Sequence, residues 1–170
     1  FFSGKKFCEI SRYIGVKKAK YENILFLDAD NFMLEANLLQ NLIMAHIENP
    51  NAAGLYPYKF DLNYNDSIIN QYCSIYGIND PYQWFLKSTE HFSYFKNQTQ
   101  LEINKIEDNG NYFKVNFKSH HKYTLGSICF LTKKKLIEKY NQKEGYIFHS
   151  DVFNNLIKSE KESFFILVKN

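Results

Sequence analysis

The chain has 170 residues, of which 45% are hydrophobic, and this length suits one domain with a sizeable core. Its formal net charge is only +3, and the lysines are spread along the sequence. This composition excludes a disordered chain and provides no basic stripe for nucleic acid, while contact with phosphates or an anionic membrane surface stays compatible with the charge.

The first half of the chain alternates predicted helices and strands. Apolar residues at helical spacing predict a helix over residues 5–20, a short strand over 23–27 and a second helix over 35–48. Residues 52–58 then predict another buried strand. The order helix, strand, helix, strand implies a parallel α/β sheet. The helix over 35–48 is expected to turn one apolar face inward, made of Leu38, Leu39, Leu42, Ile43 and Ile47.

The second half is predicted to be less regular. Residues 64–88 have a mainly helical pattern that is broken at Gly77 and at Asn79-Asp80-Pro81. Alternating residues on both sides of Asp108-Asn109-Gly110-Asn111 predict a β-hairpin near 101–118. The remaining predicted elements are a strand over 124–132, helices over 133–140 and 151–159, and a closing strand over 164–168. We therefore expect a single domain over 1–170, with a mostly parallel sheet flanked by helices and the hairpin inserted into it.

Residues 24–31, Ile-Leu-Phe-Leu-Asp-Ala-Asp-Asn, combine an apolar strand with two acids directly after it. Asp28 and Asp30 are two residues apart, so in extended backbone their side chains share a face. They would lie at the end of a strand, where open α/β sheets bind ligands. Two acids this close repel each other unless a cation relieves them, and a divalent metal with oxygen ligands does so while often carrying a diphosphate. The alternative is a simple turn or helix cap.

The position of this motif on the first predicted strand is itself informative. A parallel sheet requires neighbours on both sides of a central strand. We therefore expect further strands before residue 1, and a chain that is a fragment of a longer protein.

Residues 11–31 resemble family 2 glycosyltransferases, which have an Arg-bearing helix, a Gly, an Ala-Lys before the strand and then the Asp-x-Asp turn. Residues 123–127, followed by the basic Lys133–Lys135, resemble that family's Gly-containing strand before a basic helix. Residues 145–152 resemble the segment that delivers its acidic catalytic residue. The resemblance covers most of 10–169. It implies a Rossmann-like GT-A fold whose first nucleotide-binding strands are missing here, a nucleotide-sugar donor, a divalent Mn or Mg ion, and inversion at the anomeric carbon.

The resemblance also suggests roles for acidic residues. Asp30 is expected to bind the metal, and Asp28 to bind the donor's ribose or sugar or to complete the metal shell through water. Asp151 is the candidate general base, because an inverting transfer needs a carboxylate near the acceptor hydroxyl. Its alternative role is the N-cap of the following helix, although Ser150 could be that cap instead.

Three other residues are candidates for the same site. His149 lies two residues before Asp151, so in an extended segment it would share that face and bind metal or acceptor. Arg12 is expected at the donor phosphates, or else in an ion pair on the helix surface. Gly126 would let the backbone approach the donor sugar, or merely relieve packing.

The predicted function is therefore that of a hexosyltransferase-like enzyme. Its acceptor could be a glycan, a lipid-linked molecule or a protein. One alternative is a phosphohydrolase of the haloacid dehalogenase type, with Asp28 as nucleophile and Asp30 as acid, although that family has Thr or Val where this chain has Phe32. Further alternatives are a nucleotidyltransferase whose phosphate loop lies upstream, and a truncated GT-A-like module that serves interactions without catalysis.

Cysteine content and hydropathy bear on the compartment. Cys8, Cys73 and Cys129 are widely spaced, which predicts neither a zinc site nor a disulfide framework. No apolar run approaches the ~20 residues that span a bilayer. We expect a cytoplasmic protein with reduced thiols and no transmembrane segment. A location at the cytoplasmic face of the membrane is also compatible with the sequence.

Overall fold

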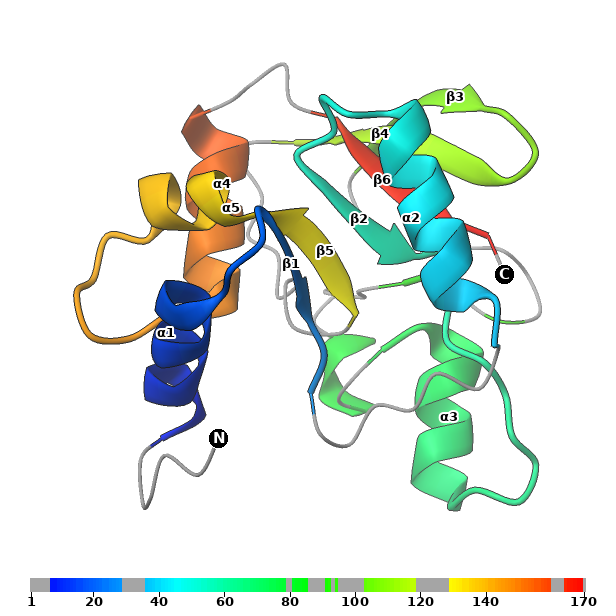
Figure 1. Ribbon diagram of the computed structural model, residues 1–170. Coiled ribbons are helices and arrows are strands. Elements are labelled where there is room, and N and C mark those ends of the chain that lie inside the picture. Colours follow the sequence, from blue (N-terminus) through cyan, green and yellow to red (C-terminus); the bar gives the residue numbers. More distant parts are fainter. Residues whose placement is uncertain are drawn as a thin grey trace.

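The structure is a computed structural model that describes residues 7–28, 36–78, 81–85, 91–92, 94, 103–118, 129–159 and 164–169. Within these ranges the predicted helices and strands are confirmed, most with somewhat shorter bounds. The helices are α1 (Cys8–Lys18), α2 (Leu38–Glu48), α3 (Ile68–Tyr76), the 3-10 helix η1 (Pro81–Gln83), α4 (Lys134–Tyr140) and α5 (His149–Ser159). The strands are β1 (Asn23–Phe26), β2 (Gly54–Pro57), β3 (Ile103–Asp108), β4 (Tyr112–Phe117), β5 (Phe130–Lys133) and β6 (Phe165–Val168) (Figure 1).

The six strands form one mixed sheet in the order β1-β5-β2-β6-β4-β3. Among these described strands, β2 and β6 are the one pair of neighbours that run parallel, whereas the other four pairs are antiparallel. The prediction of an α/β fold with helices flanking a sheet is confirmed. The prediction that this sheet is mostly parallel is wrong.

The error has a physical cause in how strands are inserted. The β1–α2–β2 crossover does run β1 and β2 in the same direction, as the alternation of helix and strand predicts. However, β5, from much later in the chain, lies between them and is antiparallel to both. The sequence pattern predicts the direction of consecutive strands, but not which later strand enters between them.

The predicted hairpin is confirmed as β3 and β4, but it is not an isolated insertion. Gly110 has a φ of +90°, a conformation that glycine adopts without strain, and its N–H donates to Asp108 Oδ1 at 3.0 Å. Asn109 Oδ1 accepts from the backbone N–H of Tyr112 at 2.9 Å, which fixes the return of the chain. Because β4 also pairs with β6, the hairpin extends the main sheet at one edge.

Helices cover both faces of the sheet, which gives three layers (Figure 1). On one face α1, α4 and α5 pack against strand residues such as Tyr56 and Phe165. On the other face α2 packs against their neighbours Leu55 and Ile166. This alternation along β2 and β6 is expected for strands buried on both faces. At the centre of the first face, Phe153 of α5 makes edge contacts with the rings of Tyr56, Phe117 and Phe130.

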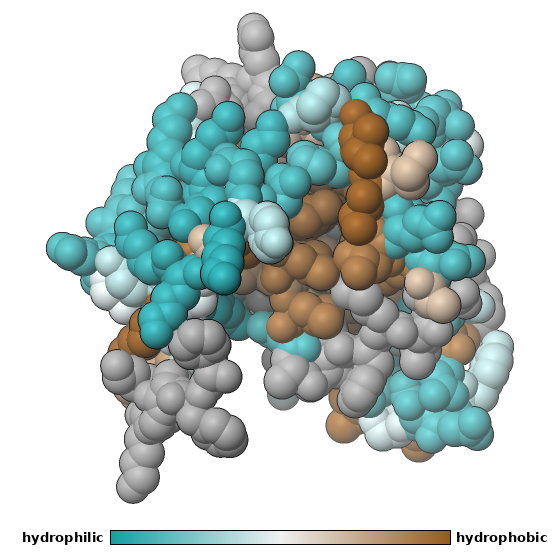
Figure 2. Space-filling view, viewed as in Figure 1, coloured by the Kyte–Doolittle hydropathy of each residue, from teal (hydrophilic) through white to brown (hydrophobic). Residues whose placement is uncertain are grey.

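The apolar face of α2 differs from the one predicted. Leu38 and Leu42 are buried as expected, together with Ala45. Leu39, Ile43 and Ile47 are instead 43%, 46% and 65% exposed, so their assignment to the inner face is wrong. Each follows the buried stripe by one or two positions, a rotation of ~100° or more around the helix. Figure 2 shows the resulting band of apolar atoms along the flank of α2.

The end of α3 depends on a close backbone contact. Gly77 ends the helix with a φ of +68°, and the N–H of His91 donates to its carbonyl at 2.9 Å. A Cβ at this position would lie 2.4 Å from the carbonyl oxygen of His91. The chain can therefore pass this closely only because residue 77 is glycine. No helix in the described part of the chain is long and apolar enough to span a membrane.

Candidate functional site

Two consecutive elements, α1 and β1, meet at the start of α1 with a segment from much later in the chain. Arg12 of α1 reaches across to Asp28, two residues beyond β1, and its Nη2 lies 2.7 Å from Asp28 Oδ1. The N–H of Ile147 donates to the carbonyl of Glu9 at 3.0 Å, which docks the segment before α5 onto α1. The motif around Arg12, the strand that carries Asp28 and the segment that carries Asp151 are therefore neighbours in space.

The Arg12–Asp28 pair is partly shielded from water. The side chains are 16% and 33% exposed respectively, and one short charge-assisted bond joins them. The alternative role of Arg12 as an ion-pair partner is thus observed, but the pair crosses to β1 and does not lie on the helix surface. The arrangement fixes the guanidinium beside the end of the strand.

His149 lies among the charged groups of this site. Burial, and to a smaller extent the charge of Arg12, lower its pKa to about 4 against the raising effects of Asp28, Glu9 and Asp151. Its Nδ1 is buried and has no hydrogen-bond partner in the structure. The imidazole is therefore neutral at neutral pH and able to accept a hydrogen bond or bind a cation.

Asp151 is exposed at the start of α5, where its carboxylate faces Lys143. The side chain is 56% exposed, and its Oδ2 lies 3.7 Å from Lys143 Nζ. The carbonyl of Phe148 accepts from the N–H groups of Asp151 and Val152, at 3.0 and 3.2 Å. Because α5 already begins at His149, Asp151 lies within its first turn, and the alternative that it is the N-cap is wrong. Ser150 also lies inside the helix.

The expectation that His149 and Asp151 share a face is wrong as well. It assumed extended backbone, whereas both residues are helical. Two positions along an α-helix are ~200° apart around its axis. His149 accordingly turns inward towards Arg12, and Asp151 turns outward towards Lys143.

Two predicted site residues lie outside the described residues, namely Asp30 and Gly126. Within the described residues, no group of three or more His, Cys, Asp or Glu side chains could hold a metal ion. Asp28 and the unpartnered Nδ1 of His149 supply two donor types that suit a divalent ion, but Asp28 already shares one oxygen with a cation. The described side chains do not by themselves amount to a metal site.

A cavity of about 510 Å³ opens beside Asp151. Lys143 and Tyr146 line it and were not predicted as site residues. Tyr146 lies inside the segment 145–152 that also contains Asp151. The two aromatic residues of this segment, Tyr146 and Phe148, are the sequence feature that indicates the cavity wall. Nothing in the sequence distinguishes Lys143 from the other lysines, since the loop conformation brings it to within 3.7 Å of Asp151.

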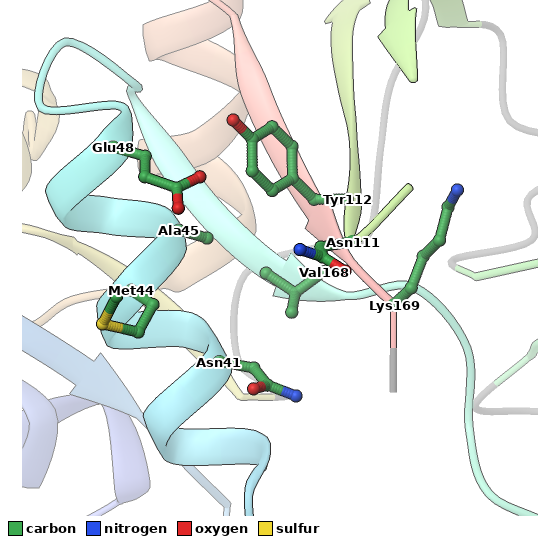
Figure 3. A pocket seen from close by; sticks show the side chains of 8 residues that line it. All are labelled: Asn41, Met44, Ala45, Glu48, Asn111, Tyr112, Val168 and Lys169. Atoms are coloured by element: carbon green, nitrogen blue, oxygen red, sulfur yellow. The ribbon is translucent and has the colours of Figure 1, made fainter. Parts of the chain in front are cut away.

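A smaller cavity of about 170 Å³ lies between α2 and the hairpin turn. In Figure 3, Asn41 and Glu48 lie on α2, while Asn111 and Lys169 lie on the other side. Lys169 is already paired with Asp108, so the charges of this cavity are partly satisfied within the sheet edge. It contains none of the predicted site residues, and the site beside α1 is the stronger candidate.

Comparison of the chain with protein-family models, with curated proteins and with solved structures returns no match. The resemblance to family 2 glycosyltransferases therefore rests on the motifs of the sequence.

Proposed function

We propose that this protein is a glycosyltransferase that moves a sugar from a nucleotide-diphosphate donor to an acceptor hydroxyl with inversion. The observation that carries the proposal is the convergence of Arg12, Asp28 and the first turn of α5. Arg12 and Asp28 belong to one stretch of the resemblance, residues 11–31, and the first turn of α5 belongs to another, residues 145–152. The hydrogen bond from Ile147 to Glu9 supports the proposal because it brings the two stretches together. An α/β sheet with Asp28 just beyond the end of β1 is compatible with a GT-A fold.

The proposed roles follow from the charges of the site. Arg12, held by Asp28, presents a guanidinium to the donor's phosphates, and Asp28 also accepts from a hydroxyl of the donor's ribose or sugar. Asp151 removes the proton from the acceptor hydroxyl, and its exposure leaves room for that acceptor. His149, neutral and partly buried between these groups, accepts a hydrogen bond or ligates the metal.

The metal is part of the proposal through Asp30, with Asp28 and His149 as further donors. A bound Mn or Mg ion would neutralise the leaving diphosphate. Gly126 is proposed to lie against the donor sugar. The acceptor is a glycan, a lipid-linked molecule or a protein, and the proposed place of action is the cytoplasm or the cytoplasmic face of the membrane.

The phosphohydrolase alternative is less well supported. It needs Asp28 as a nucleophile with an accessible carboxylate, whereas Oδ1 of Asp28 is bound by Arg12 at 2.7 Å. An ion pair of this kind lowers the nucleophilicity of the carboxylate. We therefore do not propose this activity.

Substitution of the candidate base separates binding from chemistry. In the full-length protein, Asp151→Asn should keep the affinity for a nucleoside diphosphate with Mn and abolish sugar transfer. Asp66→Asn, an exposed acid outside the site, is the matched control and should keep both. Transfer that persists in Asp151→Asn would show that another group is the base.

A further inference from the structure

The cavity beside Asp151 has an aromatic wall. Phe7 of the segment before α1, together with Tyr146 and Phe148 before α5, lines its 510 Å³. Phe148 stacks on His149 with the ring centroids 5.4 Å apart, so its orientation is fixed by the site itself. The volume falls within the ~300–1,000 Å³ that is typical of small-molecule sites. Phe7 and Phe148 are 78% and 41% exposed, so both rings are accessible to a ligand.

The charged groups of the same cavity are Glu9, Lys143 and Asp151. Lys143 Nζ lies 3.7 Å from Asp151 Oδ2 and 5.1 Å from the centre of the Tyr146 ring. Its pKa is raised by the hydrogen bond with Tyr146 and by the charge of Asp151, so it stays protonated. Two carboxylates outnumber one ammonium, and this balance disfavours an anionic ligand.

We propose that this cavity binds an uncharged pyranose ring of the acceptor, so that the acceptor is a glycan. A pyranose has an apolar C–H face, which packs on aromatic rings, and a hydroxyl edge, which needs hydrogen-bond partners. Glu9 and Asp151 accept from such hydroxyls and Lys143 donates to them. This inference rests on the proposed function in one respect, namely that the bound pyranose is the acceptor and Asp151 takes the proton from one of its hydroxyls.

A binding experiment without donor tests the proposal independently of catalysis. Backbone amide spectra of the full-length ¹⁵N-labelled protein are recorded during titration with methyl β-glucopyranoside, methyl β-galactopyranoside and methyl α-mannopyranoside. We expect saturable shifts at Phe7, Tyr146 and Phe148 with at least one glycoside. Phe148→Ala should weaken this binding about tenfold, which corresponds to ~1.4 kcal/mol. Phe85→Ala, an exposed phenylalanine outside the cavity, should leave it unchanged.

Phe7→Ala is a second variant that does not disturb the first turn of α5, and it should also weaken binding. No saturable shift with any of the three glycosides, while a nucleoside diphosphate with Mn still binds, would overturn the glycan acceptor and leave the transferase intact. Saturable glycoside binding without any binding of nucleoside diphosphate would support the pyranose site and contradict the transferase. Preferential binding of octyl phosphate at these residues would also overturn the proposal, because it would favour a lipid phosphate.

Discussion

The ion pair between Arg12 and Asp28 should contribute measurably to stability. A double-mutant cycle uses Arg12→Met, which keeps most of the aliphatic stem, and Asp28→Asn, which keeps the shape of the carboxylate. Double-mutant cycles of exposed pairs give a coupling of ~0.2–1 kcal/mol, and the coupling rises as water is excluded from the pair. With side chains 16% and 33% exposed and a 2.7 Å bond, this pair should lie above that range. We expect a coupling of about 1–2 kcal/mol.

The free energy of unfolding is measured by urea denaturation, followed by Trp84 fluorescence and far-UV circular dichroism. The matched control is the Lys17–Glu138 pair, with atoms 3.6 Å apart and side chains 54% and 41% exposed. Its coupling should stay below ~0.5 kcal/mol and should fall more steeply with added salt. Equal coupling energies in the two pairs would refute the argument that partial burial strengthens the Arg12–Asp28 contact.

Three further predictions concern stability. His149 has a folded pKa of about 4 against 6.5 when unfolded, so stability is greatest above pH 6.5 and falls by up to roughly 3 kcal/mol towards pH 4. His149→Gln should remove this contribution and leave the fall that is due to the buried His91, whose pKa is lowered to about 3. An unchanged profile would contradict the burial argument. Phe153→Ala should lower the free energy of unfolding, measured by urea denaturation, by about 3–5 kcal/mol, because the ring is 1% exposed and packs among other aromatic rings. A loss no larger than that of an ordinary surface substitution would contradict this packing. Gly77→Ala should raise the unfolded fraction more than Gly110→Ala. Both glycines have a positive φ, but a Cβ at residue 77 would meet the backbone of His91, whereas a Cβ at residue 110 has open space. Equal effects of the two substitutions would show that His91 moves away easily.

The sequence predicted most elements of the fold because each has a local signal. The apolar spacing of α5, the turn at Asn109-Gly110 and the short strand before Asp28 are all features of neighbouring residues. The insertion of β5 between β1 and β2 depends on hydrogen bonds between residues that are about a hundred positions apart, so no local pattern encodes it. The same limit applies to α2, where apolar residues on two stripes left its buried face ambiguous.

The candidate site was predictable to the extent that its motifs are contiguous. Arg12, Asp28 and Asp151 each stand in a recognisable segment, and the structure brings these segments together. The prediction that His149 and Asp151 share a face was wrong, because α5 begins two residues earlier than its apolar pattern indicates. Lys143 was missed for another reason: its position beside Asp151 depends on a loop conformation that tertiary contacts determine.

Metal-dependent nucleotide binding tests the central claim most directly. Calorimetry of the full-length protein with Mn and a panel of nucleoside diphosphates should show saturable binding that requires the metal. Arg12→Met should weaken it, and Asp30→Ala should abolish metal binding, and with it nucleotide binding, while the fold is retained. Absence of metal-dependent binding for every nucleotide in the panel would contradict the transferase and leave a domain that serves interactions without catalysis.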